Sequence, residues 1–89
     1  MATVPYRADM PKAKFTRDSA ILLTLLKAVR TGAALTQAEM AKKLGQPQSF
    51  VSKYESGERR LDVLELRQVC RASGISLIDF IRKLEAGSR

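Results

Sequence analysis

Apolar residues recur three and four positions apart in five stretches of this chain, and glycines or helix-capping residues separate the stretches. Such spacing is typical of amphipathic helices that each pack one face against a shared core. The predicted helices run from 18 to about 31, from Thr36 to Gly45, from Pro47 to Gly57, from 62 to about 74, and from 76 to 87. No stretch shows the two-residue alternation of a strand, so the sequence predicts an all-α, compact five-helix bundle.

The first of these helices carries more apolar residues than one buried stripe needs. The stripe expected to face the core consists of Ile21, Leu22, Leu25, Ala28 and Val29. Leu23 and Leu26 fall partly outside it. The pattern leaves two alternatives for this pair, which either completes the core or contacts a partner chain.

The second and third helices are short and follow each other closely. Thr36 and Glu39 have the spacing of a capping box, in which each side chain accepts a hydrogen bond from the other residue's amide. Gly45 suits the left-handed residue that ends a helix, and Pro47 suits the start of the next one. Ala41 is small at the position where the two helices cross, so this segment is predicted to be a helix-turn-helix.

The third helix presents an aromatic residue whose environment the pattern leaves open. Val51 and Tyr54 are expected to face the core, and Phe50 does not belong to that pair. A phenylalanine ring is costly to leave in water. A helix-turn-helix is a common DNA-binding unit. Phe50 is therefore expected either to contact thymine methyl groups or backbone sugar of a bound DNA, or to pack against Tyr54 one turn later.

The fourth and fifth helices are predicted to begin with the same N-terminal signal as the second. Asp62 and Glu65 have the capping-box spacing, and Ser76 and Asp79 repeat it. The remaining segment, residues 1–15, holds two of the three prolines and no helical or strand period. We therefore expect a flexible basic arm over 1–15 and a single small domain over 16–89.

Charge and composition narrow the function classes. Sixteen Lys and Arg residues against nine Asp and Glu residues give the 89-residue chain a net charge of +7. That surplus favours an anionic partner, nucleic acid or a membrane surface, although solubility alone would also account for it. The single cysteine, Cys70, forms no disulfide within the chain and suits the cytoplasm.

Several chemistries lack the residues they need. The chain has no histidine, no clustered acid pair, no phosphate-binding glycine loop and no run of 18 apolar residues. We therefore expect no enzyme activity, cofactor or metal site, and no membrane-spanning helix. A membrane-surface role is disfavoured because no helix pairs a broad basic face with an aromatic-rich apolar face.

The helix-turn-helix segment resembles the DNA-binding domain of the Cro/C1 (XRE) family, which includes the lambdoid phage repressors. The residues that carry the resemblance are Gln37, Ala41, Gly45, Gln48, Ser49, Val51, Glu55 and Gly57, together with Arg30 seven residues before Gln37. It covers roughly residues 18–84, and the chain departs from the family pattern at Gln46, where an aliphatic residue is usual. The resemblance implies a lambda-repressor-like domain that binds double-stranded DNA.

Four residues on the outward face of the third helix are the predicted base contacts. They are Gln48, Ser49, Ser52 and Lys53. The third helix should enter the major groove, where base edges display distinguishable donors and acceptors. Gln48 suits adenine, which offers the N6 donor and the N7 acceptor, and Lys53 suits guanine or a phosphate.

Four further residues are predicted to contact the DNA backbone. Arg59 and Arg60 lie in the loop after the third helix, while the resemblance implies phosphate contacts for Gln37 and Ser56. It also implies a Gln37–Gln48 pair, which would couple backbone position to base readout. Finally, it implies a structural ion pair between Arg30 and Glu55, which would fix the angle of the third helix.

The expected function is sequence-specific regulation of transcription, in which a homodimer reads a palindromic operator as a repressor. Ile78 and neighbouring Leu84 on the fifth helix are where the dimer contact is expected. The alternative is the antitoxin of a toxin–antitoxin pair, whose 1–15 arm would fold on the toxin. A restriction–modification controller would use the same chemistry in another setting.

Overall fold

The structure, a computed structural model, describes residues 16–88. Five α-helices make up this range, and none of its residues forms a strand. The helices are α1 (Arg17–Gly32), α2 (Gln37–Leu44), α3 (Gln48–Ser56), α4 (Val63–Ser73) and α5 (Leu77–Gly87). The all-α, five-helix prediction is confirmed, while the predicted arm over 1–15 lies outside the described residues.

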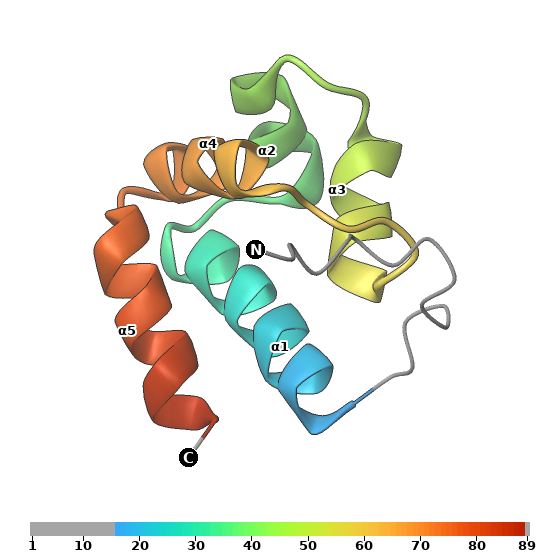
Figure 1. Cartoon of the computed structure of the whole chain (residues 1–89). Helices are drawn as coiled ribbons and strands as arrows, with labels where there is room; N and C mark the ends of the chain where they lie inside the picture. The colour runs from blue at the N-terminus through green and yellow to red at the C-terminus, as the bar shows by residue number, and fades with distance from the viewer. Residues whose placement is uncertain (1–15, 89) are drawn as a thin grey trace, which may run out of the picture.

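Helix α1 is the central element of the bundle. It contacts α3, α4 and α5, and Figure 1 shows it lying between α3 on one side and α5 on the other. Helix α2 packs against both α3 and α4. The core receives side chains from every helix, namely Leu26, Met40, Ala41, Val51, Tyr54, Val69, Cys70 and Phe80.

The stripe predicted for α1 was partly wrong. Leu26 is the most buried apolar residue of this helix and Leu23 packs against the core, whereas Ala28 is exposed. Because α3 and α5 contact α1 from two sides, its buried surface is wider than one stripe. The leucines outside the expected stripe therefore complete the core.

Helix α1 ends at Gly32, within one residue of the predicted end at about 31, but Gly32 is not the left-handed residue that follows the helix. Gly32 is helical, and the left-handed residue is Ala34, with φ of 59°. The amides of Ala34 and Leu35 donate to the carbonyl oxygens of Thr31 and Arg30, at 2.9 and 3.2 Å. This is a Schellman ending, in which an alanine holds the position that glycine usually occupies.

The turn between α2 and α3 follows the sequence signals closely. Both capping-box bonds at the start of α2 are present, with the Glu39 amide donating to Thr36 Oγ1 at 3.1 Å and the Thr36 amide donating to Glu39 Oε1 at 2.8 Å. Gly45 is left-handed, with φ of 67°. Pro47 is the N-cap of α3, one position earlier than a first helical residue, so no side chain caps the first amides of α3.

The two later capping boxes have different outcomes. Asp62 and Glu65 form both bonds at the start of α4. At the start of α5, the Asp79 amide donates to Ser76 Oγ at 3.0 Å, but the return bond is absent from the described contacts of these residues. Aspartate is one methylene shorter than glutamate, and the Asp79 carboxylate lies 3.5 Å from Arg82 instead.

Within residues 16–88, no single helix is long and apolar enough to cross a membrane. Helices α1 and α2 reach the required length and composition only when taken together, and they are bent by 91° at the break between them.

Candidate nucleic-acid interface

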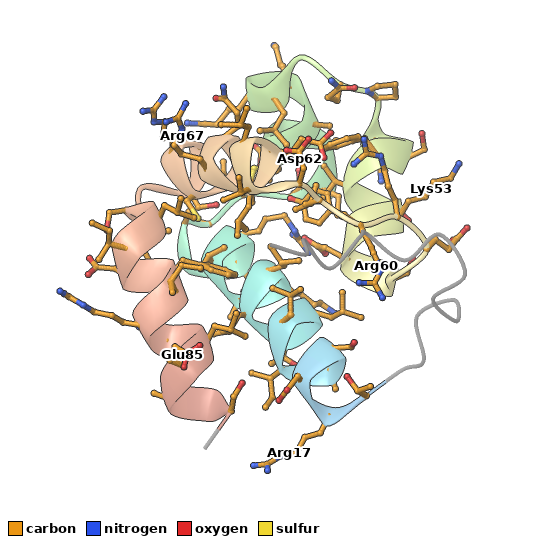
Figure 2. All side chains as sticks on the ribbon, viewed as in Figure 1. Arg17, Lys53, Arg60, Asp62, Arg67 and Glu85 are labelled. Carbon is orange, nitrogen blue, oxygen red and sulfur yellow. The ribbon has the colours of Figure 1, made fainter. Side chains whose placement is uncertain are left out.

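The outer face of α3 is polar and open to solvent. Gln48, Ser49, Ser52 and Lys53, the four predicted base contacts, are all exposed there, and Figure 2 shows Lys53 pointing away from the bundle. On the opposite face, Val51 and Tyr54 are completely buried. The helix is therefore anchored by two core side chains and offers hydrogen-bonding groups along its free side.

The position of α3 relative to α1 is fixed by a buried ion pair. Arg30 Nε donates to Glu55 Oε2 at 2.6 Å, and Arg30 Nη2 donates to Glu55 Oε1 at 3.0 Å. The two side chains are only 9% and 5% exposed. The hydrogen bond that Arg30 donates to Glu55 is the main cause that raises the pKa of Arg30, and burial opposes it. The structure thus brings together the pair that the resemblance implied.

The same arginine also holds the segment between α1 and α2. Arg30 Nη1 donates to the carbonyl oxygen of Leu35 at 2.8 Å. Leu35 immediately precedes Thr36, the N-cap of α2. One guanidinium therefore ties the first helix to both helices of the helix-turn-helix.

The two glutamines of the predicted pair lie next to each other. Gln37 is the first residue of α2 and Gln48 the first of α3. Gln48 Nε2 lies 3.5 Å from Gln37 Oε1, the outer limit of a hydrogen bond. Gln37 Nε2 donates to Glu55 Oε1 at 3.2 Å, a contact that sequence reasoning missed because it joins residues 18 positions apart.

The loop after α3 separates its two arginines into different environments. Arg59 makes two contacts with Glu65, the shorter at 2.7 Å, and its guanidinium carbon lies 4.6 Å from the ring centroid of Phe50. Arg60 is exposed. Of the two loop arginines among the predicted backbone contacts, Arg59 already forms an ion pair within the protein, and Arg60 is the more accessible.

Phe50 packs against Tyr54, which was one of the two expected outcomes. The ring centroids are 5.6 Å apart and the rings are nearly perpendicular, with an angle of 77°. Arg59 also lies over the Phe50 ring, so this half-buried ring contacts both a cation and a core tyrosine. The sequence signal for this arrangement was the spacing of four between the aromatic residues, which places them on adjacent turns.

Ser56 ends α3 and its side chain is used locally. The hydroxyl donates to the carbonyl oxygen of Lys53 at 3.1 Å and accepts from the Glu58 amide at 3.4 Å. Ser56 is exposed, so a lone pair of the hydroxyl remains accessible.

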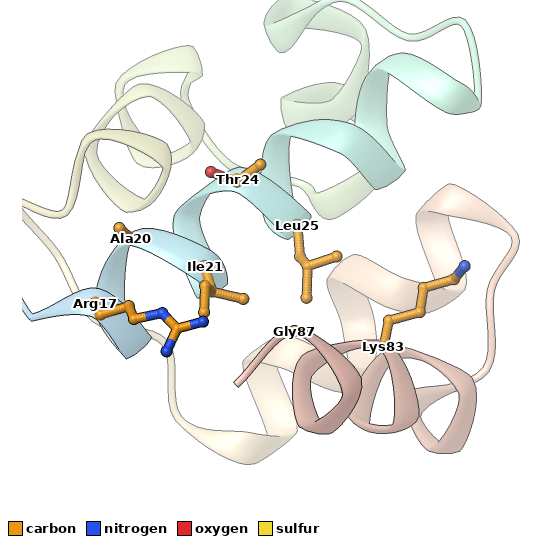
Figure 3. A pocket seen from close by; sticks show the side chains of 7 residues that line it. All are labelled: Arg17, Ala20, Ile21, Thr24, Leu25, Lys83 and Gly87. Carbon is orange, nitrogen blue, oxygen red and sulfur yellow. The ribbon is translucent and has the colours of Figure 1, made fainter. Parts of the chain in front are cut away.

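A groove also lies away from the α3 face. An apolar groove of about 290 Å³ between α1 and α5, drawn in Figure 3, is lined by Arg17, Ala20, Ile21, Thr24, Leu25, Lys83 and Gly87. None of the predicted DNA contacts lines it. Over residues 16–88, no three side chains of metal-binding type come together.

Two short helices joined by a tight turn, the second with an exposed polar face, are typical of helix-turn-helix DNA-binding domains. Comparison with known proteins agrees. Residues 26–80 match the family model for helix-turn-helix domains. The solved structure of an XRE-family like protein from Pseudomonas syringae pv. tomato str. DC3000 is 49% identical, with a TM-score of 0.73, and the match covers 82% of this chain and 88% of that one. No curated protein matches the chain.

The chain belongs to the XRE family of helix-turn-helix proteins. Its domain is therefore that of a DNA-binding transcription regulator.

Proposed function

We propose that this protein is a sequence-specific transcriptional repressor, which binds a palindromic operator as a homodimer and reads it in the major groove. The observation that carries the proposal is the exposed polar face of α3, fixed from behind by the Arg30–Glu55 ion pair. A rigid reading helix is what discrimination between base sequences requires, because a mobile one would satisfy many sequences equally.

Gln48 is the main base contact of this proposal. It begins α3, and the N-terminal residues of a recognition helix reach furthest into the groove. Ser49, Ser52 and Lys53 extend the contact along the same exposed face. Adenine is the base that matches a glutamine amide, and guanine is the base that matches the Lys53 ammonium.

The proposed backbone contacts flank this face. Gln37 lies at the N-terminus of α2, where the helix dipole favours a phosphate. Ser56 and Arg60 follow at the far end of α3. Arg59 would have to share its guanidinium between Glu65 and a phosphate, so we assign it a smaller part than Arg60.

The homodimer is proposed to form through α5. Ile78 is 64% exposed and Ile81, one turn later on the same side, is 39% exposed. Leu84, which was expected beside Ile78, is half-buried and borders a hollow with α1 residues. The proposed contact is therefore shifted toward Ile81. The test is sedimentation of the wild type and of Ile78→Asp, which should be monomeric.

Selection from a randomised duplex pool tests the proposal as a whole. We expect an inverted repeat whose half-sites lie about one helical turn apart, with selectivity of about a thousandfold or more over random DNA. Gln48→Ala should relax one position in each half-site, while Arg60→Ala should weaken all sequences alike and reduce the salt dependence. Uniform, salt-sensitive binding without an enriched motif would contradict the proposal.

An antitoxin is the second candidate function. Val63 and Leu64, adjacent on the first turn of α4, are 62% and 61% exposed, and neighbouring exposed apolar side chains mark protein contacts. The discriminating observation is whether a small toxin copurifies with the protein or is encoded beside it.

A further inference from the structure

A continuous chain of polar contacts runs from α1 to the reading face of α3. Arg30 pairs with Glu55, Gln37 Nε2 donates to Glu55 Oε1 at 3.2 Å, and Gln48 Nε2 lies 3.5 Å from Gln37 Oε1. Gln37 therefore stands between a buried carboxylate and the first residue of the recognition helix. The amide nitrogen of Gln37 contacts the Glu55 carboxylate, and its amide oxygen contacts Gln48.

The direction of the Gln37 amide is dictated by its neighbour. A carboxylate paired with an arginine only accepts hydrogen bonds, whereas an amide has a donating nitrogen and an accepting oxygen. Glu55 is 5% exposed, so an oxygen turned toward it would meet a negative charge with little water to screen the repulsion. The nitrogen of Gln37 must therefore face Glu55, and its oxygen must face Gln48.

The direction of the Gln48 amide follows from that of Gln37. An oxygen on Gln37 selects the nitrogen of Gln48 as its partner. Gln48 is then left with a free oxygen and its second N–H. Adenine in the major groove presents the complement of this pair, the N6 donor and the N7 acceptor, while guanine presents two acceptors.

We propose that Glu55 is a positioning residue for specificity, which sets the preference of Gln48 for adenine over guanine by fixing the direction of both glutamine amides. The inference rests on the proposed function, because it concerns how the α3 face reads a base. It assigns Glu55 a second task besides the ion pair, and that task acts through Gln37.

Glu55→Gln tests the positioning role of Glu55, and because it also removes the charge of the ion pair, its control must weaken that pair alone. The new amide oxygen should take the Oε2 position, where Arg30 Nε donates at the shortest distance, 2.6 Å. The new nitrogen then takes the Oε1 position and faces Gln37, with loss of the longer contact from Arg30 Nη2. Gln37 then presents its nitrogen to Gln48, and Gln48 in turn directs its own oxygen to Gln37. Only N–H groups remain for the base, and the preference for adenine over guanine should fall by about tenfold or more.

The matched control is Arg30→Lys. Lysine keeps the positive charge beside Glu55 but loses the two-point geometry of the ion pair, so it weakens the structural task alone. We expect this variant to melt at a lower temperature and bind less tightly, with the adenine preference of the wild type. A loss of preference in both variants would overturn the inference, because rigidity alone would then explain it.

The measurement uses duplexes that carry the selected operator and differ only at the position relaxed by Gln48→Ala. Fluorescence anisotropy at one salt concentration gives the ratio of dissociation constants for adenine and guanine in each variant. An unchanged ratio in folded Glu55→Gln would overturn the inference and leave the proposed function intact. Wild-type protein that binds all duplexes alike would overturn both.

A measurement on the wild-type protein alone covers the case in which Glu55→Gln does not fold. In the NMR spectrum, the side-chain amide protons of Gln37 should show nuclear Overhauser effects to the γ-methylene protons of Glu55. The reversed direction would place those protons toward Gln48 and remove the effects. That result would overturn the inference without any DNA.

Discussion

The junctions on either side of the helix-turn-helix are built from the same parts. Residues 33–36 join α1 to α2, and residues 57–62 join α3 to α4. Each contains a left-handed residue and the N-cap residue of a capping box. Each is also held by an arginine that contacts a glutamate through two nitrogens, Arg30 near the end of α1 and Arg59 within the second junction. They differ in burial and in the residue that takes the left-handed conformation.

Burial decides what each ion pair does. Arg30 and Glu55 are 9% and 5% exposed, while Arg59 and Glu65 are 39% and 31% exposed. Two desolvated charges depend on each other, because removing one leaves the other without water or partner. Two half-exposed charges are screened by solvent and can exchange partners. The ion pair at the first junction therefore fixes the position of α3 relative to α1, and the second junction retains an arginine that solvent still reaches.

The largest effect that this comparison predicts is that of Arg30→Ala. The variant leaves the buried Glu55 carboxylate without its positive partner and with Gln37 as its remaining side-chain donor among the described contacts. It should lower the free energy of unfolding by about 3–5 kcal/mol. Thermal unfolding followed by circular dichroism measures it. Lys53→Ala, which removes an exposed charge from α3, is the control and should change stability little. Equal melting temperatures for the two variants would show that the ion pair is not structural.

The second effect concerns the left-handed residue of the second junction. Gly57 has φ of 88°, and a Cβ there would lie 3.1 Å from Leu23 Cδ1. Gly57→Ala should therefore destabilise the protein by about 1–2 kcal/mol. Gly32→Ala is the matched control because Gly32 is helical and has open space at its Cβ, and it should stabilise by about 0.5–1 kcal/mol. If both substitutions lowered the free energy of unfolding, or both raised it, the proposed difference between a left-handed Gly57 and a helical Gly32 would be refuted.

The first junction allows the opposite substitution. Ala34 adopts the left-handed conformation, in which its Cβ is sterically strained, whereas a glycine has no Cβ and would not be. Ala34→Gly should raise the free energy of unfolding by about 0.5–1 kcal/mol, since relief of the strain exceeds the added entropy of the unfolded chain. Urea unfolding should show a higher midpoint and an unchanged slope. A lower midpoint would mean that the alanine is unstrained.

The smallest predicted effect is a change in how the stability of the fold depends on pH below 4.5. The hydrogen bond from Arg59 is the main cause that lowers the pKa of Glu65 below its ordinary 4.5. A lowered pKa stabilises the fold above pH 4.5, and this contribution is lost as the pH falls further. In Arg59→Ala, the pKa of Glu65 should rise, so the variant and the wild type should converge in stability as acid is added.

The capping glutamate of the first junction is the internal control for that titration. A hydrogen bond from the Thr36 amide is the main cause that lowers the pKa of Glu39. Arg59 is not among its causes, so carboxyl NMR should show an unchanged pKa for Glu39 in Arg59→Ala. A shift of both glutamates would indicate a general change in the fold.

Local signals predicted most of the fold. Capping boxes depend on residues three apart, and Gly45 acts within its own turn, so Thr36–Glu39, Asp62–Glu65 and Gly45 were accessible from the sequence. The error at α1 had a tertiary cause, because two neighbouring helices widen its buried surface to include Leu26. No local pattern carries that information.

The contacts within the candidate site were predicted only in part. The resemblance supplied Arg30 with Glu55 and Gln37 with Gln48, and the structure places the members of each pair in contact. It did not supply the bond between Gln37 and Glu55 that joins the two pairs. Arg59 was expected at the DNA backbone because a loop arginine carries no sign of a partner six residues later in the sequence. Contact of the eight predicted residues with DNA stays a prediction.

Tyr54 gives the protein a built-in optical reporter. The chain has no tryptophan, and Tyr54 is completely buried at the base of the reading helix. Burial is the main cause that raises the pKa of its phenol far above the ordinary 10, and the hydroxyl has no hydrogen-bond partner among the described residues. The ring therefore remains neutral in alkali for as long as the bundle is closed. In a Tyr6→Phe variant, which removes the other tyrosine of the chain, ultraviolet absorbance of the Tyr54 phenolate will then mark the opening of the core beneath α3, with no attached dye.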